Sequence, residues 1–137
     1  MTDRTLGILG LAKKGNRLQA GDEPAGAAAR SRDACLLLVA ADAAENTGRR
    51  AQHYARYGDI PVAVLPYSKT ELGAVLGRSS CAIAALTDPG LAFSFISALE
   101  GSNPGTYTRQ YAALEEIDAK KRRLDKERAA HARKRKA

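Results

Sequence analysis

The residues with the clearest chemical potential are basic, and they gather in two parts of the chain. One group precedes a glycine at position 21 and consists of Lys13, Lys14 and Arg17. The other lies in the C-terminal tail, as two runs at 120–123 and 133–136. Ammonium and guanidinium groups bind phosphate through charge and hydrogen bonds. Such runs typically bind nucleic acid without reading sequence, although a solvated tail or a helix that contacts another protein carries the same charges.

The net charge of +7 is concentrated in the tail. From residue 109 onward there are eleven Lys or Arg and five Asp or Glu, whereas residues 1–108 contain eleven basic and ten acidic residues. The first hundred residues are therefore nearly neutral, and any long-range attraction for a polyanion comes from the tail.

Several classes of function lack the residues they need. Cys35 and Cys81 each begin an apolar run, and no Cys or His pair has metal-ligand spacing, so we expect buried thiols, no structural metal and no cofactor. Neither GxGxxG nor GxxxxGK[ST] nor Gly-x-Ser-x-Gly occurs. No apolar stretch reaches the roughly 18 to 20 residues of a membrane span, and no signal segment begins the chain. These features predict a non-enzymatic cytoplasmic protein with no membrane partner.

The elements that would position the basic residues are organised around one strand, helix and parallel strand. Residues 36–40 and 62–65 are unbroken apolar runs, typical of strands covered on both faces. The segment between them predicts a helix, which a capping box of Asp42 and Glu45 would start.

Other signals complete the fold. We expect helices at 3–14, ended by Gly15, and at 25–32, with a short strand at 17–20. A second capping box, Ser68 with Glu71, begins a helix that Gly77 ends, and a strand at 81–86 precedes a helix with Asp88 or Thr87 as N-cap. The pattern predicts an α/β fold: a three-layer α/β/α sandwich with a four-stranded mixed sheet, plus a basic C-terminal helical tail. We divide the chain into a sandwich at 1–100, a linker at 101–106, and a helical or partly disordered basic tail at 107–137.

Six segments, in this order, resemble the kink-turn RNA-binding ribosomal protein superfamily of the "L-seven-Ae" type, and within it the bacterial YlxQ-like branch. They are Leu9-Gly-Leu-Ala-Lys-Lys, Leu18-Gln-Ala-Gly-Asp-Glu, Leu37-Leu-Val-Ala-Ala-Asp-Ala-Ala-Glu-Asn-Thr, Ile60-Pro-Val, Lys69-Thr-Glu-Leu-Gly, and Ala82-Ile-Ala-Ala-Leu-Thr-Asp-Pro-Gly-Leu-Ala. The resemblance spans about residues 5 to 99 and implies a sandwich that grips a sharply bent RNA internal loop.

In that family, a Gly-x-Asn-Glu turn at the start of the second helix reads sheared G·A pairs, and a Lys one helical turn later holds phosphate. Here Gly21 keeps the glycine and Arg17 keeps an upstream basic residue. Three positions of this motif depart from the pattern: Glu23 replaces Asn, Pro24 replaces Glu, and Ala27 replaces Lys. Just before the motif, Gln19 and Ala20 also fall where lysines are common in the family. A carboxylate only accepts hydrogen bonds and repels phosphate, so the resemblance implies weak or altered recognition.

The candidate RNA-binding residues combine this resemblance with the charge pattern. We expect Lys13, Lys14 and Arg17 to form, with Arg30 and Arg32, one basic surface beside the Gly21 turn. Gly21 is equally explained by a need for backbone freedom, and Asp22 and Glu23 by the helix dipole. The remaining candidates are the loop before the last strand and the first tail run: Arg78, Ser79, Ser80, Lys120, Lys121, Arg122 and Arg123.

The sequence therefore predicts an RNA-binding protein associated with the ribosome or translation, with RNA and ribosomal or other translation proteins as partners. One alternative is a protein interaction module of the same fold that has lost RNA recognition. Another is a substrate-binding fragment like those attached to RNA methyltransferases, against which the lack of a following catalytic domain argues.

Overall fold

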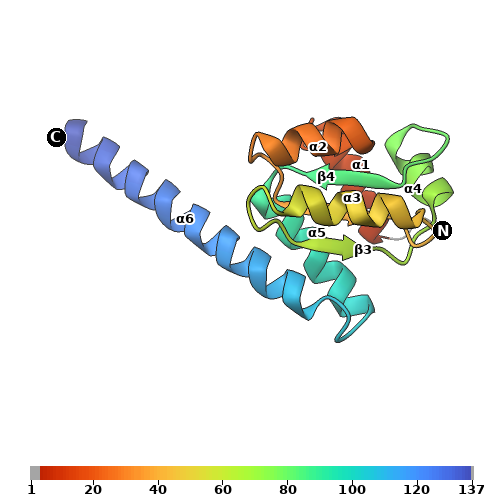
Figure 1. Ribbon diagram of the computed structural model, residues 1–137. Coiled ribbons are helices and arrows are strands. Elements are labelled where there is room, and N and C mark those ends of the chain that lie inside the picture. Colours follow the sequence, from red (N-terminus) through yellow and green to blue (C-terminus); the bar gives the residue numbers. More distant parts are fainter. Residues whose placement is uncertain (1–3, 137) are drawn as a thin grey trace.

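A four-stranded sheet lies between two layers of helices, and one long helix projects from this body (Figure 1). The computed structural model describes the backbone of residues 4–136 and the side chains of residues 4–134. Asp3, the first residue of the first predicted helix, lies outside this range. The predicted three-layer α/β/α sandwich with a mixed sheet is confirmed. Its strands are β1 (Leu18–Ala20), β2 (Leu36–Val39), β3 (Val62–Val64) and β4 (Ile83–Leu86).

The strand order is β1-β4-β2-β3. Strand β4 is antiparallel to both β1 and β2, whereas β2 and β3 are parallel, with Leu37 opposite Val62. The helix α3 (Glu45–Ala55) connects the two parallel strands, as the sequence predicts. The short strands β1 and β3 form the two edges.

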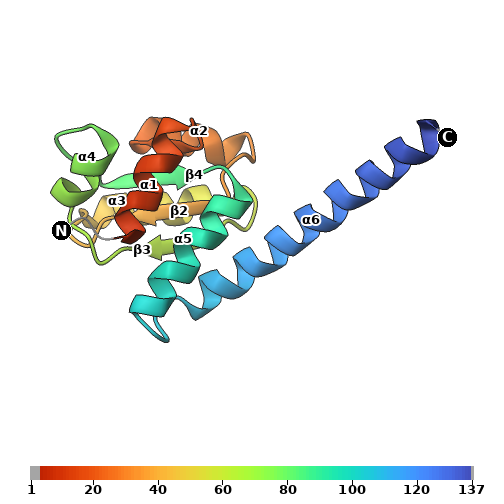
Figure 2. The ribbon, with the colours of Figure 1, turned by 180° about the vertical axis from the view of Figure 1, so that it is seen from behind.

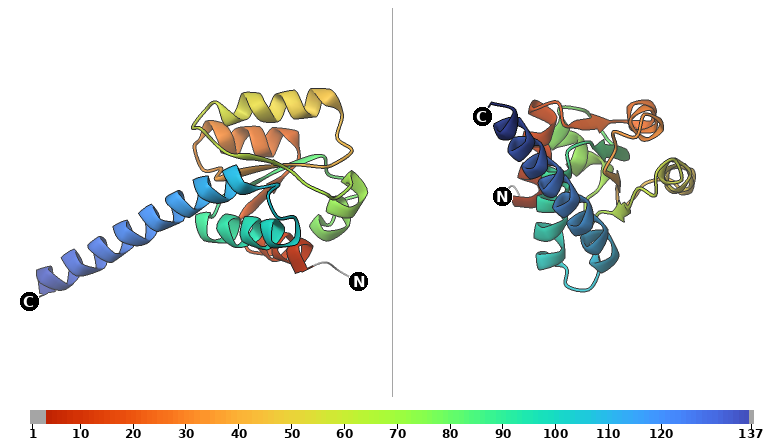
Figure 3. Two further views of the ribbon diagram at one scale, coloured as in Figure 1. Left: turned by 90° about the horizontal axis from the view of Figure 1, so that it is seen from below. Right: turned by 90° about the vertical axis from the view of Figure 1, so that its left-hand side faces the viewer.

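Alternate side chains of the central strands enter two separate cores, which explains the unbroken apolar run of β2. Leu36 and Leu38 face a core shared with α1 (Arg4–Lys14), α4 (Lys69–Leu76) and α5 (Pro89–Ser102). Leu37 and Val39 face the other core, under α2 (Asp22–Arg30) and α3. The left panel of Figure 3 shows α2 and α3, orange and yellow, on one side of the sheet, with α1 and α5 on the other.

Of the predicted caps of α3, α4 and α5, two are confirmed and one is wrong, and α2 begins at Asp22 rather than at the predicted Ala25. The Ser68 and Glu71 capping box is present, and Asp88 accepts from the Leu91 N–H at 2.9 Å as the N-cap of α5. Asp42, however, does not cap α3, which begins after Ala44 without a side-chain cap. Asp42 Oδ1 instead accepts from the Lys69 N–H at 2.8 Å, because the pairing of β2 with β3 brings this loop beside the start of α4.

Helix ends follow backbone conformation more closely than residue type. Gly77 takes the left-handed conformation at the end of α4, as expected. At the end of α1, the left-handed residue is Asn16, with φ 57°, rather than Gly15. Asparagine tolerates this conformation better than most residues because its short side chain can hydrogen-bond locally.

The helix α6 (Thr108–Lys136) belongs to the body in its first half only. Leu114 is fully buried, whereas every residue from Ala119 to Lys134 is exposed. The turn before α6 is held by Glu100, whose Oε1 accepts from the Tyr107 N–H at 3.1 Å. Figure 2 shows α6 folding back along α5 and then leaving the body as a single projecting helix.

The start of α6 also closes the β3 edge of the sheet. The Tyr107 hydroxyl donates to the Val64 carbonyl at 2.7 Å, and Gln110 Nε2 donates to the Val62 carbonyl at 2.8 Å. Unpaired carbonyls on an edge strand invite pairing with other chains. A shortened protein that keeps this protection must therefore retain α6 through about residue 118.

Candidate nucleic-acid interface

The turn between β1 and α2 is built on Gly21. Its φ of 103° and ψ of 163° lie where side-chain-bearing residues are strained. The Gly21 N–H donates to the Ile83 carbonyl at 2.9 Å, and the Gly21 carbonyl accepts the first bond of α2, from Ala25, at 3.0 Å. Backbone freedom alone therefore accounts for this glycine.

The loop between α4 and β4 lies against this turn. Arg78 Nη1 donates to the Ala20 carbonyl at 2.9 Å, and a Cβ on Gly21 would meet that same nitrogen at 3.0 Å. Arg78, Ser79 and Ser80 are all exposed. The two elements that the family resemblance assigns to RNA contact, 57 residues apart along the chain, therefore share one corner of the molecule.

Lys13 belongs to this corner as well. Burial raises the pKa of the Cys81 thiol, while the Gly21 N–H and the charges of Arg78 and Lys13 lower it, so each of these three groups lies within electrostatic reach of the thiol. A hollow of about 470 Å³ between α1 and α4 continues the corner and is lined by Lys13, Lys14 and Gly77 among others. We call Lys13, Lys14, Gly21 and residues 78–80 the glycine corner.

The start of α2 is less favourable to anions than a typical helix N-terminus. Asp22 accepts from Arg50 Nη1 and from the Tyr54 hydroxyl, both at 3.1 Å, and so is tied to α3. Burial raises the pKa of Tyr54, and its hydrogen bond to Asp22 adds to the effect. Glu23 is exposed, and Pro24 has no N–H to donate. One backbone donor is thus lost, and two carboxylates stand where phosphate would approach.

Three predicted residues lie elsewhere, so the expectation of a single basic surface is wrong for them. Arg17 occupies the opposite end of β1 and pairs with Asp88 at 2.9 Å. Arg30 and Arg32 lie at the C-terminal end of α2, about 13 Å of helix away from Gly21. The Arg30 guanidinium sits 5.8 Å from the centre of the Tyr54 ring. Arg32 is exposed, with a left-handed φ of 64°.

Asp88 joins Arg17 to the tail. Besides Arg17, its Oδ1 lies 3.6 Å from Lys121 Nζ of α6. On the next turn back, Asp118 is buried and pairs with Arg122 at 2.9 Å. Burial, followed by the Asp88 charge, raises the pKa of the nearby Cys35 to about 11, so this thiol stays protonated at neutral pH. Lys121 therefore links α6 to the start of α5, whereas Arg122 pairs within α6, and all four cations of the run at 120–123 are exposed.

The charge of Asp88 should make stability depend on pH. Burial raises the pKa of Asp88, but the Leu91 N–H and the charges of Lys121 and Arg17 outweigh it, so the pKa lies below its usual value. Its stabilisation is therefore complete above the unfolded-state pKa, near 4, and is lost as pH falls through the folded-state pKa. In thermal melts from neutral to acid pH, the melting temperature of Asp88→Asn should fall less steeply with acidification than that of the unchanged protein. At pH 7 this variant, which keeps the helix cap, should lose about 0.5–1 kcal/mol of the free energy of unfolding.

The control for this experiment is Asp125→Asn, because Asp125 has no ion pair among the described residues. In this control, the melting temperature should fall with acidification as it does in the unchanged protein. If Asp88→Asn and Asp125→Asn behave alike, Asp88 does not hold α6 electrostatically.

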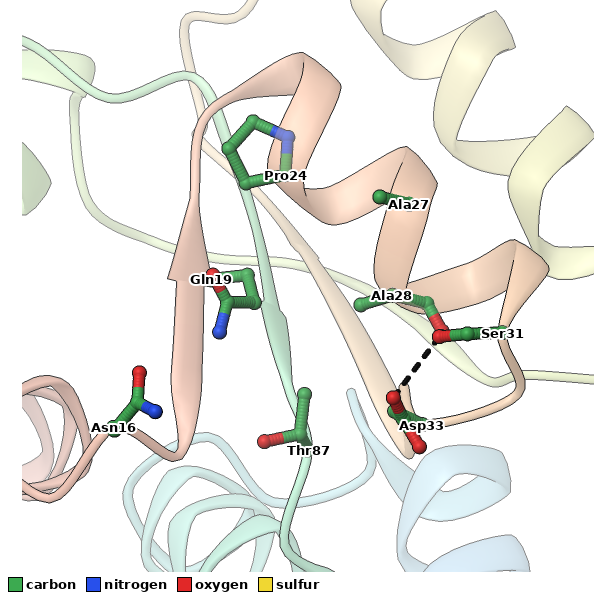
Figure 4. Close-up of a pocket in the computed structure, with 8 residues that line it drawn as sticks. All are labelled: Asn16, Gln19, Pro24, Ala27, Ala28, Ser31, Asp33 and Thr87. Atoms are coloured by element: carbon green, nitrogen blue, oxygen red, sulfur yellow. Dashed lines mark hydrogen bonds between the residues drawn. The ribbon is translucent and has the colours of Figure 1, made fainter.

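A groove runs along the face of α2 that adjoins the edge strand β1 (Figure 4). It has a volume of about 600 Å³, and Asp33 supplies its single charge. Pro24 and Ala27, two of the three departures from the family pattern, lie on its wall. The other residues that line it are Asn16, Gln19, Ala28, Ser31 and Thr87.

Sequence reasoning missed three residues that organise this region: Asp88 as the partner of two cations, and Arg50 and Tyr54 as the partners of Asp22. Asp88 was expected only as a helix cap. Its ion pair with Arg17 depends on the pairing of β1 with β4, and no local pattern reveals that pairing. Arg50 and Tyr54 are four residues apart on α3, so they share a face, but their polar partner lies on another helix.

Within the described residues, no group of His, Cys, Asp or Glu is arranged to hold a metal ion. No helix in this part of the chain combines the length and apolar character needed to cross a membrane.

Comparisons with known proteins place the chain in a family, although a scan against protein families finds no match. "RNA-binding protein YlxQ" of Bacillus subtilis (strain 168) is 33% identical over 97 residues, which are 68% of this chain and 92% of that protein. Two solved structures share the fold. A protein of unknown function from Bacillus halodurans C has a TM-score of 0.67 at 22% identity, covering 72% of this chain and 99% of that one. The Giardia lamblia 15.5kD RNA binding protein has a TM-score of 0.57 at 15% identity, covering 74% and 92%. The chain belongs to the YlxQ-like family of the L-seven-Ae type.

Proposed function

We propose that this protein is a non-enzymatic RNA-binding protein that recognises structured, kink-turn-like RNA weakly or with altered specificity. One observation carries the proposal: a relative that is 33% identical over 92% of its own length is named an RNA-binding protein. The partner is ribosomal or another structured RNA. The protein acts in the cytoplasm, in association with the ribosome or other translation proteins.

The glycine corner supports this function. It combines the Gly21 turn, the guanidinium of Arg78, two serine hydroxyls and the ammonium groups of Lys13 and Lys14. Backbone N–H groups, hydroxyls and cations are the donors that proteins use on phosphate and sugar. They position an RNA backbone, and the glycine lets the guanidinium of Arg78 lie against the turn.

The α2 groove supports weak rather than tight binding. Gln19, Pro24 and Ala27 line it, and none of them carries a positive charge. Each missing phosphate contact removes part of the counterion release that drives association. Glu23 and Asp22 add repulsion at the same end.

A fluorescence anisotropy titration at near-physiological salt tests the proposal. It compares a kink-turn RNA with a duplex in which Watson–Crick pairs replace the internal loop. We expect tighter binding to the kink-turn RNA, by about tenfold if one to two base or backbone contacts discriminate. Arg78→Gln should reduce this preference, whereas Arg56→Gln, at an exposed position after α3, should not.

Equal affinity for the two RNAs would count against recognition of the internal loop. In that case, a partner protein that still co-purifies after nuclease treatment would favour the interaction-module alternative.

A further inference from the structure

The exposed half of α6 is a helix surrounded by positive charge. We call residues 119–136 the basic arm; they include ten Lys or Arg and two Asp or Glu. The arm is about 27 Å long. Because successive helical residues are 100° apart, the run at 120–123 presents cations in four directions. Leu124 is the one exposed large apolar side chain among the arm's described residues. Charge complementarity therefore points to a polyanion rather than to an apolar helix partner.

The arm is held at its root by the body. Leu114 is fully buried one turn before Asp118, which is itself buried and pairs with Arg122 at 2.9 Å. Lys121 reaches Asp88 at the start of α5. The burial of Leu114 and Asp118 and the Lys121–Asp88 pair hold the root of the arm against the body. The left panel of Figure 3 shows the direction in which α6 then leaves the sandwich.

The root of the arm adjoins one end of the α2 groove. Asp33 and Thr87 line that end. The charges of Asp33, Asp88 and Lys121 all affect the pKa of the Cys35 thiol. In Figure 4 the pale blue ribbon of α6 passes on the Asp33 side of the groove. Pro24, which follows the Gly21 turn by three residues, lines the other end. The groove thus connects the glycine corner to the arm.

Resting on the proposed function, we infer that the basic arm is a rigid extension of the RNA site that holds a duplex stem continuous with the internal loop. RNA seated at the glycine corner follows the α2 groove, which has no cation and one carboxylate, Asp33, and meets cations again at Lys121 and beyond. The arm supplies phosphate contacts that the groove lacks. Its charges on all sides suit a duplex read by backbone and shape, since duplex RNA hides its base edges from side chains.

The test separates the arm's charge from its direction. Two RNAs share one internal loop, and one has a stem of about 16 base pairs, a length that duplex-RNA-binding domains span, while the other stem is a third as long. The protein should prefer the long-stem RNA by on the order of tenfold. Ala119→Pro keeps every charge but breaks the helix at its root, and should abolish this preference. Ala132→Pro, near the tip, is the matched control and should retain most of it.

A second variant replaces Lys120, Arg123, Lys126 and Arg128 with Gln, which preserves the helix and keeps Lys121 and Arg122 with their carboxylate partners. It should lose the stem preference and flatten the salt dependence, by about 0.9 per lost contact in the slope of log K against log salt. If Ala119→Pro remains folded by circular dichroism and keeps the stem preference, the arm acts as a flexible polycation and the inference is overturned. If an unlinked duplex competes as well as the attached stem, it is overturned too.

Failure of the proposed function would look different. The titration against the matched duplex would show no preference for the internal loop, whatever the stem length. If the protein still preferred RNA with the internal loop but did not prefer the longer stem, only the inference about the basic arm would be contradicted.

Discussion

The triple variant Glu23→Asn, Pro24→Glu and Ala27→Lys should bind a kink-turn RNA about 100-fold more tightly than the unchanged protein, a difference of about 2.7 kcal/mol. These are the residues that the family resemblance places at the three departing positions. All three native side chains are exposed at the start of α2, so the fold should tolerate the changes. The gain should be largest for RNA with an intact internal loop.

Each substitution contributes through a different physical effect. Asn at position 23 offers a donor and an acceptor to a base edge and removes a charge that repels phosphate. Glu at position 24 restores a backbone N–H that Pro lacks and suits the first turn of a helix. Lys at position 27 brings a cation to the groove wall, where the native alanine makes no polar contact.

The measurement is an anisotropy titration of the kink-turn RNA and its matched duplex, repeated at several salt concentrations. The control is Ala112→Lys, which adds the same charge at an exposed position on α6, near the opposite edge of the sheet. If the triple variant gains no more than this control, the α2 groove does not face the RNA.

The parts of the fold that were predictable are those fixed by local patterns. The run at 36–39 buries all four residues, since both faces of β2 are covered, and such a run predicts a central strand. Ser68, Glu71 and Asp88 each accept from an N–H group three residues away, and Pro89 has no N–H that needs a partner, so their roles follow from spacing alone.

The parts that were not predictable depend on which strands are neighbours. Asp42 and Glu45 have the spacing of a capping box, but the carboxylate of Asp42 finds the Lys69 N–H, 27 residues away. Arg17 meets Asp88 across 71 residues because β1 pairs with β4. Local sequence shows that these side chains are polar, and only the strand order determines which partner each one reaches.

The candidate site was predictable to the extent that its elements share one end of the sheet. The resemblance assigns both the Gly21 turn and the loop at Arg78 to one RNA site, and the structure brings them together. Arg30 and Arg32 were grouped with them because they are basic and lie on the same helix. A nine-residue helix separates its ends too widely for that grouping to hold.

Replacing Gly73 with Ala should both destabilise the protein and weaken RNA binding, because the loop of the glycine corner passes directly over this residue. A Cβ at Gly73 would lie 2.7 Å from the Ser80 Cα and 2.8 Å from both the Arg78 carbonyl oxygen and the Ser80 nitrogen. These are backbone atoms and cannot rotate away. Overpacking of this kind costs about 1–3 kcal/mol, more than the roughly 1 kcal/mol that Ala gains over Gly in a helix.

The same displacement should raise the dissociation constant for kink-turn RNA by about tenfold, since moving the loop breaks the bond from Arg78 to Ala20 and disperses the donors around Gly21. Gly101→Ala is the matched control, because a Cβ at this exposed helical glycine, at the far end of α5, meets nothing within 4 Å, and it should not destabilise the protein or change affinity. A double-mutant cycle identifies the route of the effect. If Gly73 acts by placing Arg78, then Arg78→Gln should cost little more in the Gly73→Ala background. Additive losses would mean that Gly73 supports the fold and that Arg78 contacts RNA independently of it.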